Sequence, residues 1–415
     1  MKKYLLFLIF IAAFAGCKKS DSGKIKMEVA FWGTKEEIPI IDKAVAKWRT
    51  EHPEVELVLT HTPNLQYLDR LLTRIAGNST PDIVFIDIKH IGAFYEKGVL
   101  MDLTPFIRKD KTLKLSKFFP TSIDRFSVDG KIYGIPRDIA PFACVYYNKK
   151  LFDEAGVPYP KNEWNWNDML EKTKKLTKKD KNGITVQFGF YTWAWQNFVY
   201  SAGGAFVDDV KHPKKCLLGT QESVEGIKFC RDLMHKYGVM PTVVQITQGM
   251  FQTGKLAMYG SGIWETPAFR KIKGFEWDFV MFPKGPSGKR AFEIGGSGYG
   301  ISNTTKYPEL AWELLKALSG DEGQIHLADT GLTQPANMEI AKGPHFAGDK
   351  RPPHNKAILN EAVKYGVYPP LPFKWNQIEK SIILPNIEKI FINEKDVDSV
   401  IKEIVPKINK ALNEK

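Results

Sequence analysis

The spacing of hydrophobic positions changes regularly along the N-terminal part of the chain. Residues 27–31 alternate apolar and polar side chains as a β-strand does, and Ile41, Val45 and Trp48 then recur at helical spacing. The segments predicted in this way are a strand at 27–31, a helix from 36, a strand at 55–59, a helix at 65–75 and a strand at 81–86. The order β-α-β-α-β predicts a parallel, doubly wound sheet.

A second α/β series follows, and the pattern between the two series indicates crossing segments. Strand-like residues at 131–147 make the first crossing, and the glycine cluster at 295–300 predicts a flexible turn just after a second crossing. The final 45 or so residues carry a helical apolar stripe. We therefore predict an α/β protein with two lobes, each a doubly wound, mainly parallel sheet. Lobe one comprises residues 25–136 and 294–335, and lobe two comprises 137–293 and 336–415.

The first residues have the pattern of an export signal. Lys2 and Lys3 precede an apolar run at 4–15, which is too short to span a bilayer and is followed by small residues and Cys17. Residues 14–17 resemble a bacterial lipobox, which implies a signal peptide at 1–16, a lipid on Cys17 and a polar tether at 17–24. The alternative is an ordinary cleaved signal in which Cys17 is incidental. Either way the protein works outside the cytoplasm, in the periplasm or on the outer face of the cell membrane.

Composition excludes some classes of partner. The 415 residues are 43% hydrophobic and 26% charged, which is enough apolar material for a large core. Lys and Arg exceed Asp and Glu by 12, but the basic residues are spread along the chain and do not interleave with stacking aromatics. We therefore expect no nucleic-acid partner.

The cysteines and histidines suggest no metal site. Cys144, Cys216 and Cys230 are too widely spaced for a C-x-x-C motif. A Cys216–Cys230 disulfide fits an oxidising compartment, although buried free thiols are favoured for a chain with so much core. The eight histidines include no HExxH pair. We expect neither a metal nor a cofactor.

Known catalytic motifs are approached but not matched. Residues 285–290 lack the spacing of a phosphate loop, and residues 295–301 fail both the dinucleotide fingerprint and the nucleophile elbow. Two carboxylates could still approach each other across a cleft as in a glycosidase, but nothing in the sequence selects a pair. An enzyme has no positive support.

The ten tryptophans are the most informative surplus in the composition. Trp48, Trp277 and Trp312 fit core patterns, and Trp164 and Trp166 are expected to cap a surface helix. The other five stand at loop starts beside glycine, proline or polar residues: Trp32, Trp193, Trp195, Trp264 and Trp375. Ligands of open parallel sheets bind beyond the carboxyl ends of strands, where we expect Trp32, Trp193 and Trp195.

Polar side chains that suit a carbohydrate stand near these tryptophans. Flat aromatic rings match the C–H faces of a pyranose, and planar carboxylates, amides and guanidinium groups match vicinal hydroxyls. The candidates are Asn64, Gln66, Asp87, Arg137, Asp138, Gln196 and Glu265. Packing alone remains the alternative for each tryptophan.

Several segments together resemble a known family. Residues 80–85, 134–136 with 146–152, 251–258, 311–315 and 331–335 resemble, in this order, the extracellular solute-binding proteins of sugar ABC importers, a group that includes maltose-binding proteins. The resemblance implies a type II two-lobe fold, closure on a sugar, no catalysis, a monomer and delivery to membrane permease subunits. It also implies ligand contacts at Trp32, Asp87, Arg137, Asp138, Trp264 and Trp375, and at Glu265 and Ser297.

One departure bears on the ligand. Ile86 stands where the maltose-binding pattern has an aromatic residue, so maltose itself is not favoured. A carbohydrate-active enzyme and a binding protein for a non-sugar solute, such as a glycerol phosphate, remain the alternatives.

Overall fold

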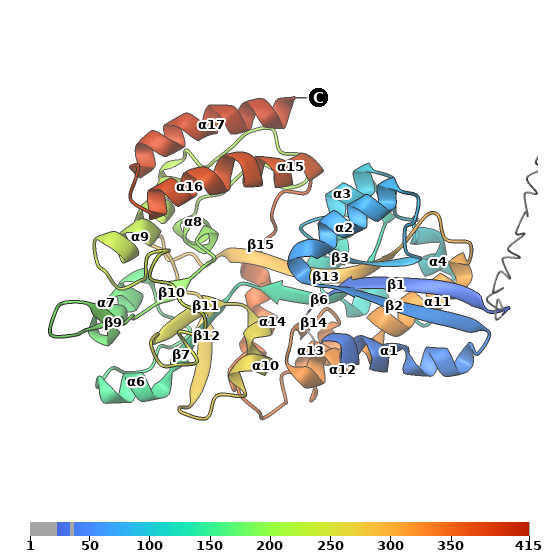
Figure 1. Cartoon of the computed structure of the whole chain (residues 1–415), viewed down its shortest axis with the longest axis horizontal. Helices are drawn as coiled ribbons and strands as arrows, with labels where there is room; N and C mark the ends of the chain where they lie inside the picture. Colours follow the sequence, from blue (N-terminus) through green and yellow to red (C-terminus); the bar gives the residue numbers. More distant parts are fainter. Residues whose placement is uncertain (1–22, 34–36, 415) are drawn as a thin grey trace, which may run out of the picture.

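The computed structural model describes residues 23–33 and 37–414, which form two lobes side by side (Figure 1). The predicted signal peptide, Cys17 and most of the tether lie outside these residues. No helix within the described ranges is long and apolar enough to cross a membrane.

Lobe one is built on a mixed sheet with the order β14-β6-β13-β3-β1-β2, and β15 pairs with β13. The neighbouring pairs β1/β2 and β1/β3 are parallel, as predicted, whereas β13 runs antiparallel to β3 and β6. The strands are β1 (Ile25–Trp32), β2 (Val55–Thr62), β3 (Ile83–Asp87), β6 (Ile135–Pro141), β13 (Phe292–Ile301), β14 (Gln334–Pro335) and β15 (Gly366–Val367).

The longer helices α1 and α11 of lobe one pack through apolar stripes. On α1, the side chains of Ile41, Val45 and Trp48 are buried, and Trp48 is 4% exposed. Burying a large apolar side chain to this extent contributes about 2–3 kcal/mol. The helices are α1 (Glu37–Glu51), α2 (Asn64–Ala76), α3 (Ile91–Glu96), α4 (Thr104–Lys109), α5 (Pro120–Arg125), α11 (Pro308–Ser319), α12 (Asp321–Thr330) and α13 (Met338–Lys342), with the short hairpin β4 (Ser127–Val128) and β5 (Lys131–Ile132).

The glycine cluster at 295–300 is strand, and the prediction of a flexible turn is wrong. These residues belong to β13, which is paired on both sides by β3 and β6. A Cβ atom on Gly298 would lie 2.5 Å from the carbonyl oxygen of Ile135 and 2.7 Å from the ring of Phe126. The glycine therefore permits a close approach of neighbouring chains, which the sequence pattern does not distinguish from a turn.

The sheet of lobe two has the order β10-β11-β7-β12. Strand β10 runs parallel to β11, but β11 and β12 both run antiparallel to β7, so the expectation of a mainly parallel sheet is wrong for this lobe. Its strands are β7 (Cys144–Asn148), β10 (Tyr191–Thr192), β11 (Met258–Ser261) and β12 (Trp277–Met281). A separate hairpin pairs β8 (Lys178–Lys179) with β9 (Thr185–Gln187).

Helices enclose the larger core of lobe two. Trp164 and Trp166 are 3% and 5% exposed in this core, so the prediction that they cap a surface helix is wrong; Asn165 between them provides the capping box of α7. The helices are α6 (Lys149–Glu154), α7 (Trp166–Leu176), α8 (Gln196–Ala202), α9 (Gln221–His235), α10 (Thr266–Phe269), α14 (Leu359–Ala362), α15 (Phe373–Ile378), α16 (Leu384–Phe391) and α17 (Val397–Asn413).

The first crossing lies later than predicted. All of β6 pairs within the sheet of lobe one, so the chain passes to lobe two at Phe142 rather than after Pro136. Likewise β13 lies in that sheet from Phe292 onward, two residues before the predicted boundary at 294. The predicted return to lobe two at residue 336 is also too early, because α13 packs on α12 and β14 and because β15 pairs with β13. Cys144, Cys216 and Cys230 are buried free thiols, as favoured from the sequence.

Candidate functional site

One aromatic wall lies at the carboxyl edge of the sheet in lobe one. Trp32 is the last residue of β1, and its ring stacks on Phe85 of β3 with centroids 3.9 Å apart, while Tyr67 of α2 lies 5.3 Å away. Asp87 ends β3, and Asn64 begins α2 directly after β2. Parallel pairing brings these ends to one edge, as predicted.

A small pocket lies beside this wall. Its volume is about 40 Å³, and Trp32, Asn64, Phe85, Asp87 and His90 are among its lining residues. The His90 Nδ1 atom is buried without a hydrogen-bond partner. Burial lowers the pKa of His90, so its ring stays neutral near pH 7 and can donate or accept a hydrogen bond.

Arg137, Asp138 and Ser297 were predicted as ligand contacts, but the structure places them inside lobe one. Arg137 donates to Asp138 at 2.8 Å and to Glu37 at 3.0 Å, and its guanidinium carbon lies 4.3 Å from the centroid of the Phe85 ring. Ser297 donates to Asp138. These three side chains are only 3–6% exposed and are not accessible to a ligand. Arg137 instead supports Phe85, on which Trp32 stacks.

The second aromatic wall belongs to lobe two. Trp193 follows β10 and Trp264 follows β11, and because these strands are parallel both tryptophans lie at the same edge, with ring centroids 6.2 Å apart. Phe142 of the first crossing packs edge-on against each of them at 5.2 Å. Trp193 is 40% exposed. The two tryptophans and Phe142 form what we call the aromatic trio.

A half-buried carboxylate, Glu265, lies beside the aromatic trio. Glu265 accepts hydrogen bonds from Ser261 at 3.0 Å and from Tyr259 at 3.3 Å. Burial nevertheless raises its pKa above the ordinary value. Glu265 is therefore a partly desolvated hydrogen-bonding group next to flat apolar rings.

Backbone geometry positions Trp264. A Cβ atom on Gly262 would lie 1.9 Å from the Trp264 ring, so this ring can lie against the backbone only because residue 262 is a glycine. Trp264 also packs against Ile40, Leu327 and Leu332 of lobe one. The two lobes therefore touch at the aromatic trio.

A second contact between the lobes is polar. We call its residues, Lys89, Gln196, Glu293 and Glu379, the polar floor. Lys89 of lobe one forms an ion pair at 2.8 Å with Glu379 of lobe two, and Gln196 at the start of α8 bonds to Glu293 of β13. Burial alone would lower the pKa of Lys89, but the carboxylates of Glu379 and Glu293 raise it. Burial raises the pKa of Glu293 to about 7.

The sequence predicted Asp87 and Gln196 in this region but missed the ion pair between Lys89 and Glu379. Lys89 and Glu379 are 290 residues apart, so their pairing follows from the assembled lobes and not from any local motif. The nearest signal is that Lys89 lies two residues after Asp87, in the loop that the family resemblance selects.

Three predicted residues lie away from both walls. Trp375 was expected in a loop, but Pro372 precedes helix α15, and Trp375 within that helix is 2% exposed against Phe206. Trp195 is 9% exposed and packs on Phe206 and Phe391. Both belong to the core of lobe two, and we leave them out of the candidate site. Gln66 is exposed on α2.

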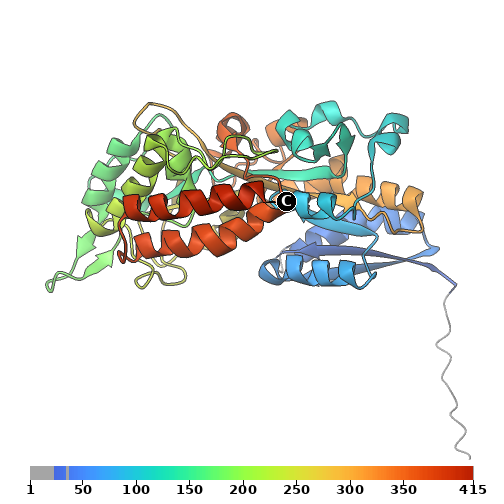
Figure 2. The same ribbon diagram turned by 90° about the horizontal axis from the view of Figure 1, so that it is seen from above.

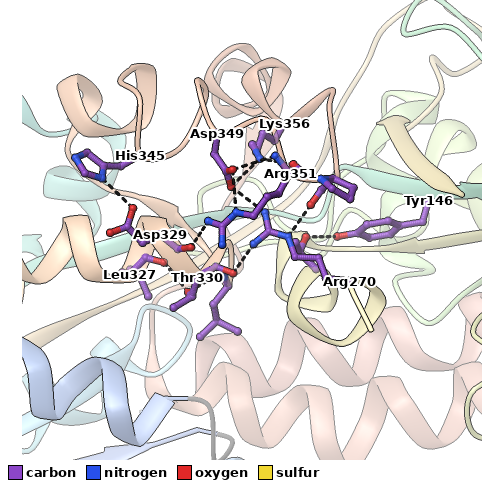
Figure 3. Close-up of polar contacts among 12 residues, drawn as sticks. Tyr146, Arg270, Leu327, Asp329, Thr330, His345, Asp349, Arg351 and Lys356 are labelled. Carbon is purple, nitrogen blue, oxygen red and sulfur yellow. Dashed lines mark hydrogen bonds and ion pairs between the residues drawn. The ribbon is translucent and has the colours of Figure 1, made fainter. Parts of the chain in front are cut away.

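A buried ionic network, shown in Figure 3, joins the lobes near α10 and α12. Arg270 of lobe two donates to the carbonyl oxygen of Thr330 in lobe one at 2.9 Å and to Asp349 at 3.0 Å. Lys356, 1% exposed, pairs with the same carboxylate at 3.1 Å. Arg351 and Lys356 hold the pKa of Asp349 well below its ordinary value despite burial.

The arrangement suits non-covalent binding. Within the described residues no group of three His, Cys, Asp or Glu side chains could hold a metal ion. Trp32 on one lobe and the aromatic trio on the other present flat apolar rings, and Asp87 and Glu265 place hydrogen-bond acceptors beside them. Such a surface can hold a ligand that alternates apolar faces with hydroxyl groups.

Comparisons with known proteins agree with this architecture. The chain is 26% identical over 362 residues to the galactooligosaccharide-binding protein of Bacillus subtilis (strain 168), covering 83% of this chain and 82% of that protein. It is 26% identical over 351 residues to a maltooligosaccharide ABC transporter solute-binding lipoprotein of Streptococcus pneumoniae (strain ATCC BAA-255 / R6), covering 80% and 78% of the two chains.

Solved structures show the same type II fold of two lobes. An ABC substrate-binding protein of Listeria monocytogenes in complex with cycloalternan superposes with a TM-score of 0.83 at 25% identity, covering 94% of this chain and all of that one. Maltose-bound MalE3 of T. maritima gives a TM-score of 0.79 at 21% identity, covering 93% and 99%. The model of the family described as bacterial extracellular solute-binding protein matches residues 33–325. The chain therefore belongs to the bacterial extracellular solute-binding protein family.

Proposed function

We propose that this protein is the extracytoplasmic substrate-binding component of an ABC importer and that it binds a carbohydrate between its two lobes. It is tethered to the cell envelope through a lipid on Cys17, acts as a monomer and delivers its ligand to permease subunits in the membrane. It makes and breaks no covalent bond.

One observation carries the proposal: exposed or half-exposed tryptophans face the ligand edge from both lobes. Trp32 stands at the carboxyl edge of the first sheet, and Trp193 and Trp264 stand at the corresponding edge of the second. Asp87 lines a pocket together with Trp32, and Glu265 is hydrogen-bonded to Trp264. A pyranose has apolar C–H faces that stack on such rings and hydroxyls that donate to such carboxylates.

The relatives support the ligand class. Those described above are named for galactooligosaccharides and maltooligosaccharides, and the Listeria protein was solved with cycloalternan. All three are carbohydrates of several sugar units. We therefore propose an oligosaccharide as the ligand and leave the sugar unit open.

Titration of the full chain with galacto-, arabino- and maltooligosaccharides, followed by calorimetry, tests the proposal. Truncating a tryptophan at the centre of a binding surface costs about 2 kcal/mol or more, which is about a 30-fold rise in Kd. We expect this loss for Trp193→Ala, with little change in melting temperature because the ring is 40% exposed. Tyr159→Ala, with a similar exposure of 38% elsewhere on lobe two, is the matched control.

Two outcomes would contradict the proposal. One is an unchanged Kd for Trp193→Ala together with normal binding by the control, which would move the ligand away from the aromatic trio. The other is release of new reducing ends from the oligosaccharide during the titration, which would indicate an exported carbohydrate-active enzyme.

A further inference from the structure

The hairpin formed by β8 and β9 is rich in lysine and takes no part in either wall of the candidate site. It extends the lysine-rich helix α7, and between residues 172 and 187 the chain carries six lysines and one acidic residue, Asp180. Asp180 accepts hydrogen bonds from the amides of Asn182 and Ile184 at 2.9 Å each, so it is engaged in the turn.

Three of these lysines are free for a partner. Lys175, Lys179 and Lys181 are exposed, and none of them takes part in the ion pairs found among the described residues. Lys178 pairs loosely with Glu154 at 3.6 Å, and the Lys174 ammonium lies 4.8 Å from the centroid of the Tyr237 ring. A structural role within the fold therefore explains only part of the positive charge.

Apolar side chains are exposed on the same hairpin. Ile184 is 62% exposed and Val186 is 50% exposed, although both are β-branched residues that normally pack. Lysines flanking exposed apolar side chains are the chemistry of a surface that contacts the headgroup region of an anionic bilayer. An acidic protein surface would match the lysines but gives less reason for exposed isoleucine and valine.

The position of the hairpin fits contact with a bilayer. Figure 2 shows the hairpin, in green, at the outer end of lobe two and the start of β1, in blue, at the outer end of lobe one, both at the lower edge of that view. A flat surface can therefore touch both ends of the molecule at once. The start of β1 follows the segment for which we propose the lipid anchor.

We propose that the β8–β9 hairpin, with Lys175, Lys179, Lys181, Ile184 and Val186, binds the surface of an anionic lipid bilayer and is a second membrane contact far from the N-terminus. This contact is independent of the sugar site. Each lysine near an anionic leaflet strengthens binding about fivefold, so three contribute about 100-fold together.

A fluorescent label at the hairpin turn tests the proposal. The full chain carrying Asn182→Cys is labelled and reconstituted into phosphatidylcholine vesicles with or without one quarter phosphatidylglycerol, both containing a headgroup-quenching lipid. The same chain without the added cysteine gives the background. We expect strong quenching only with phosphatidylglycerol, and loss of that quenching at 0.5 M salt, where the Debye length falls to a few ångströms.

Charge variants distinguish an effect of the hairpin lysines from an effect of the net charge of the protein. Lys175→Gln/Lys179→Gln/Lys181→Gln should lower quenching to the level in pure phosphatidylcholine. The control Lys402→Gln/Lys407→Gln/Lys410→Gln removes the same charge from exposed positions on α17 and should leave quenching unchanged.

Three results would overturn the proposal. The first is equal quenching in both kinds of vesicle, and the second is an equal loss of quenching in both triple variants. The third is a change in the fluorescence of the label that appears only when permease subunits are added. The last would identify a protein partner. None of these results would change the measured affinity for oligosaccharides, so the membrane proposal and the proposed function can fail independently.

Discussion

Replacing Glu293 by Gln should make the protein less sensitive to pH between 5 and 8. Glu293 is surrounded by Lys89, Glu379, Asp87 and Gln196, and burial raises its pKa to about 7 from an ordinary value of 4.5. The folded state therefore binds more protons than the unfolded state within that window. It follows that the free energy of unfolding falls as pH rises from 4.5 through 7.

The size of the effect follows from the shift. Each pKa unit corresponds to about 1.4 kcal/mol, so a rise from 4.5 to about 7 is worth at most about 3 to 4 kcal/mol. Glu293→Gln carries no charge at any pH and keeps an amide that can still bond to Gln196. At pH 5 we expect the two proteins to differ by less than about 1 kcal/mol, and at pH 8.5 we expect the variant to be more stable by up to about 3 to 4 kcal/mol.

Urea unfolding at half-unit steps from pH 5 to 8.5 measures this difference. The exposed Glu171→Gln variant on α7 is the control and should follow the wild type at every pH. All three proteins contain the same histidines, and His90 lies near Asp87, Lys89 and Glu379, so the comparison reports the titration of residue 293 together with this group. Parallel curves for wild type and Glu293→Gln would refute the reasoning, because they would mean that Glu293 is ionised at the same pH in the folded and unfolded states.

Two further substitutions test the contacts between and within the lobes. Arg270→Met removes a charged donor that is 15% exposed and should lower the free energy of unfolding by about 2–4 kcal/mol in urea titrations; an equal loss in the exposed control Arg108→Met would exclude a specific role for the network. Gly262→Ala should displace the Trp264 ring and weaken oligosaccharide binding at least tenfold by calorimetry, whereas Gly274→Ala, where no atom lies within 4 Å, should bind normally. Equal affinity in both glycine variants would show that the ring position does not matter.

Local sequence patterns predicted the elements that local forces determine. The β-α-β-α-β order at the N-terminus is confirmed, and with it the placement of Trp32 and Asp87 at one sheet edge. Alternation and helical stripes identify such elements because each buries one face against its neighbours. The membership in a solute-binding family, expected from short ordered segments, is also confirmed.

The errors concern residues whose environment is set by distant parts of the chain. Gly298 reads as a turn residue, but its neighbours Phe126 and Ile135 come from elsewhere and require a bare backbone in a strand. Trp375 follows a proline-rich run and reads as a loop, yet tertiary packing against Phe206 buries it. Exposure of a single tryptophan cannot be derived from its sequence neighbours alone.

The polar floor was missed for the same reason. Its ions come from lobe one, from β13 and from the C-terminal helices, and only the folded chain brings Lys89 to Glu379. Short-range patterns carry no information on pairings of this length.

The direction of β7 has a mechanical consequence for movements of lobe two. Because β7 is antiparallel to β11 and β12, the chain enters this lobe at Phe142, beside the tryptophans, and leaves β12 at the same edge. The aromatic trio therefore lies near the axis of any rotation of lobe two about the crossings. The outer end of the lobe, which we call its tip, lies far from that axis and moves furthest. Ring packing at the ligand edge can persist through a rotation that displaces the tip most, so distance probes of lobe closure belong at the outer end, away from the tryptophans.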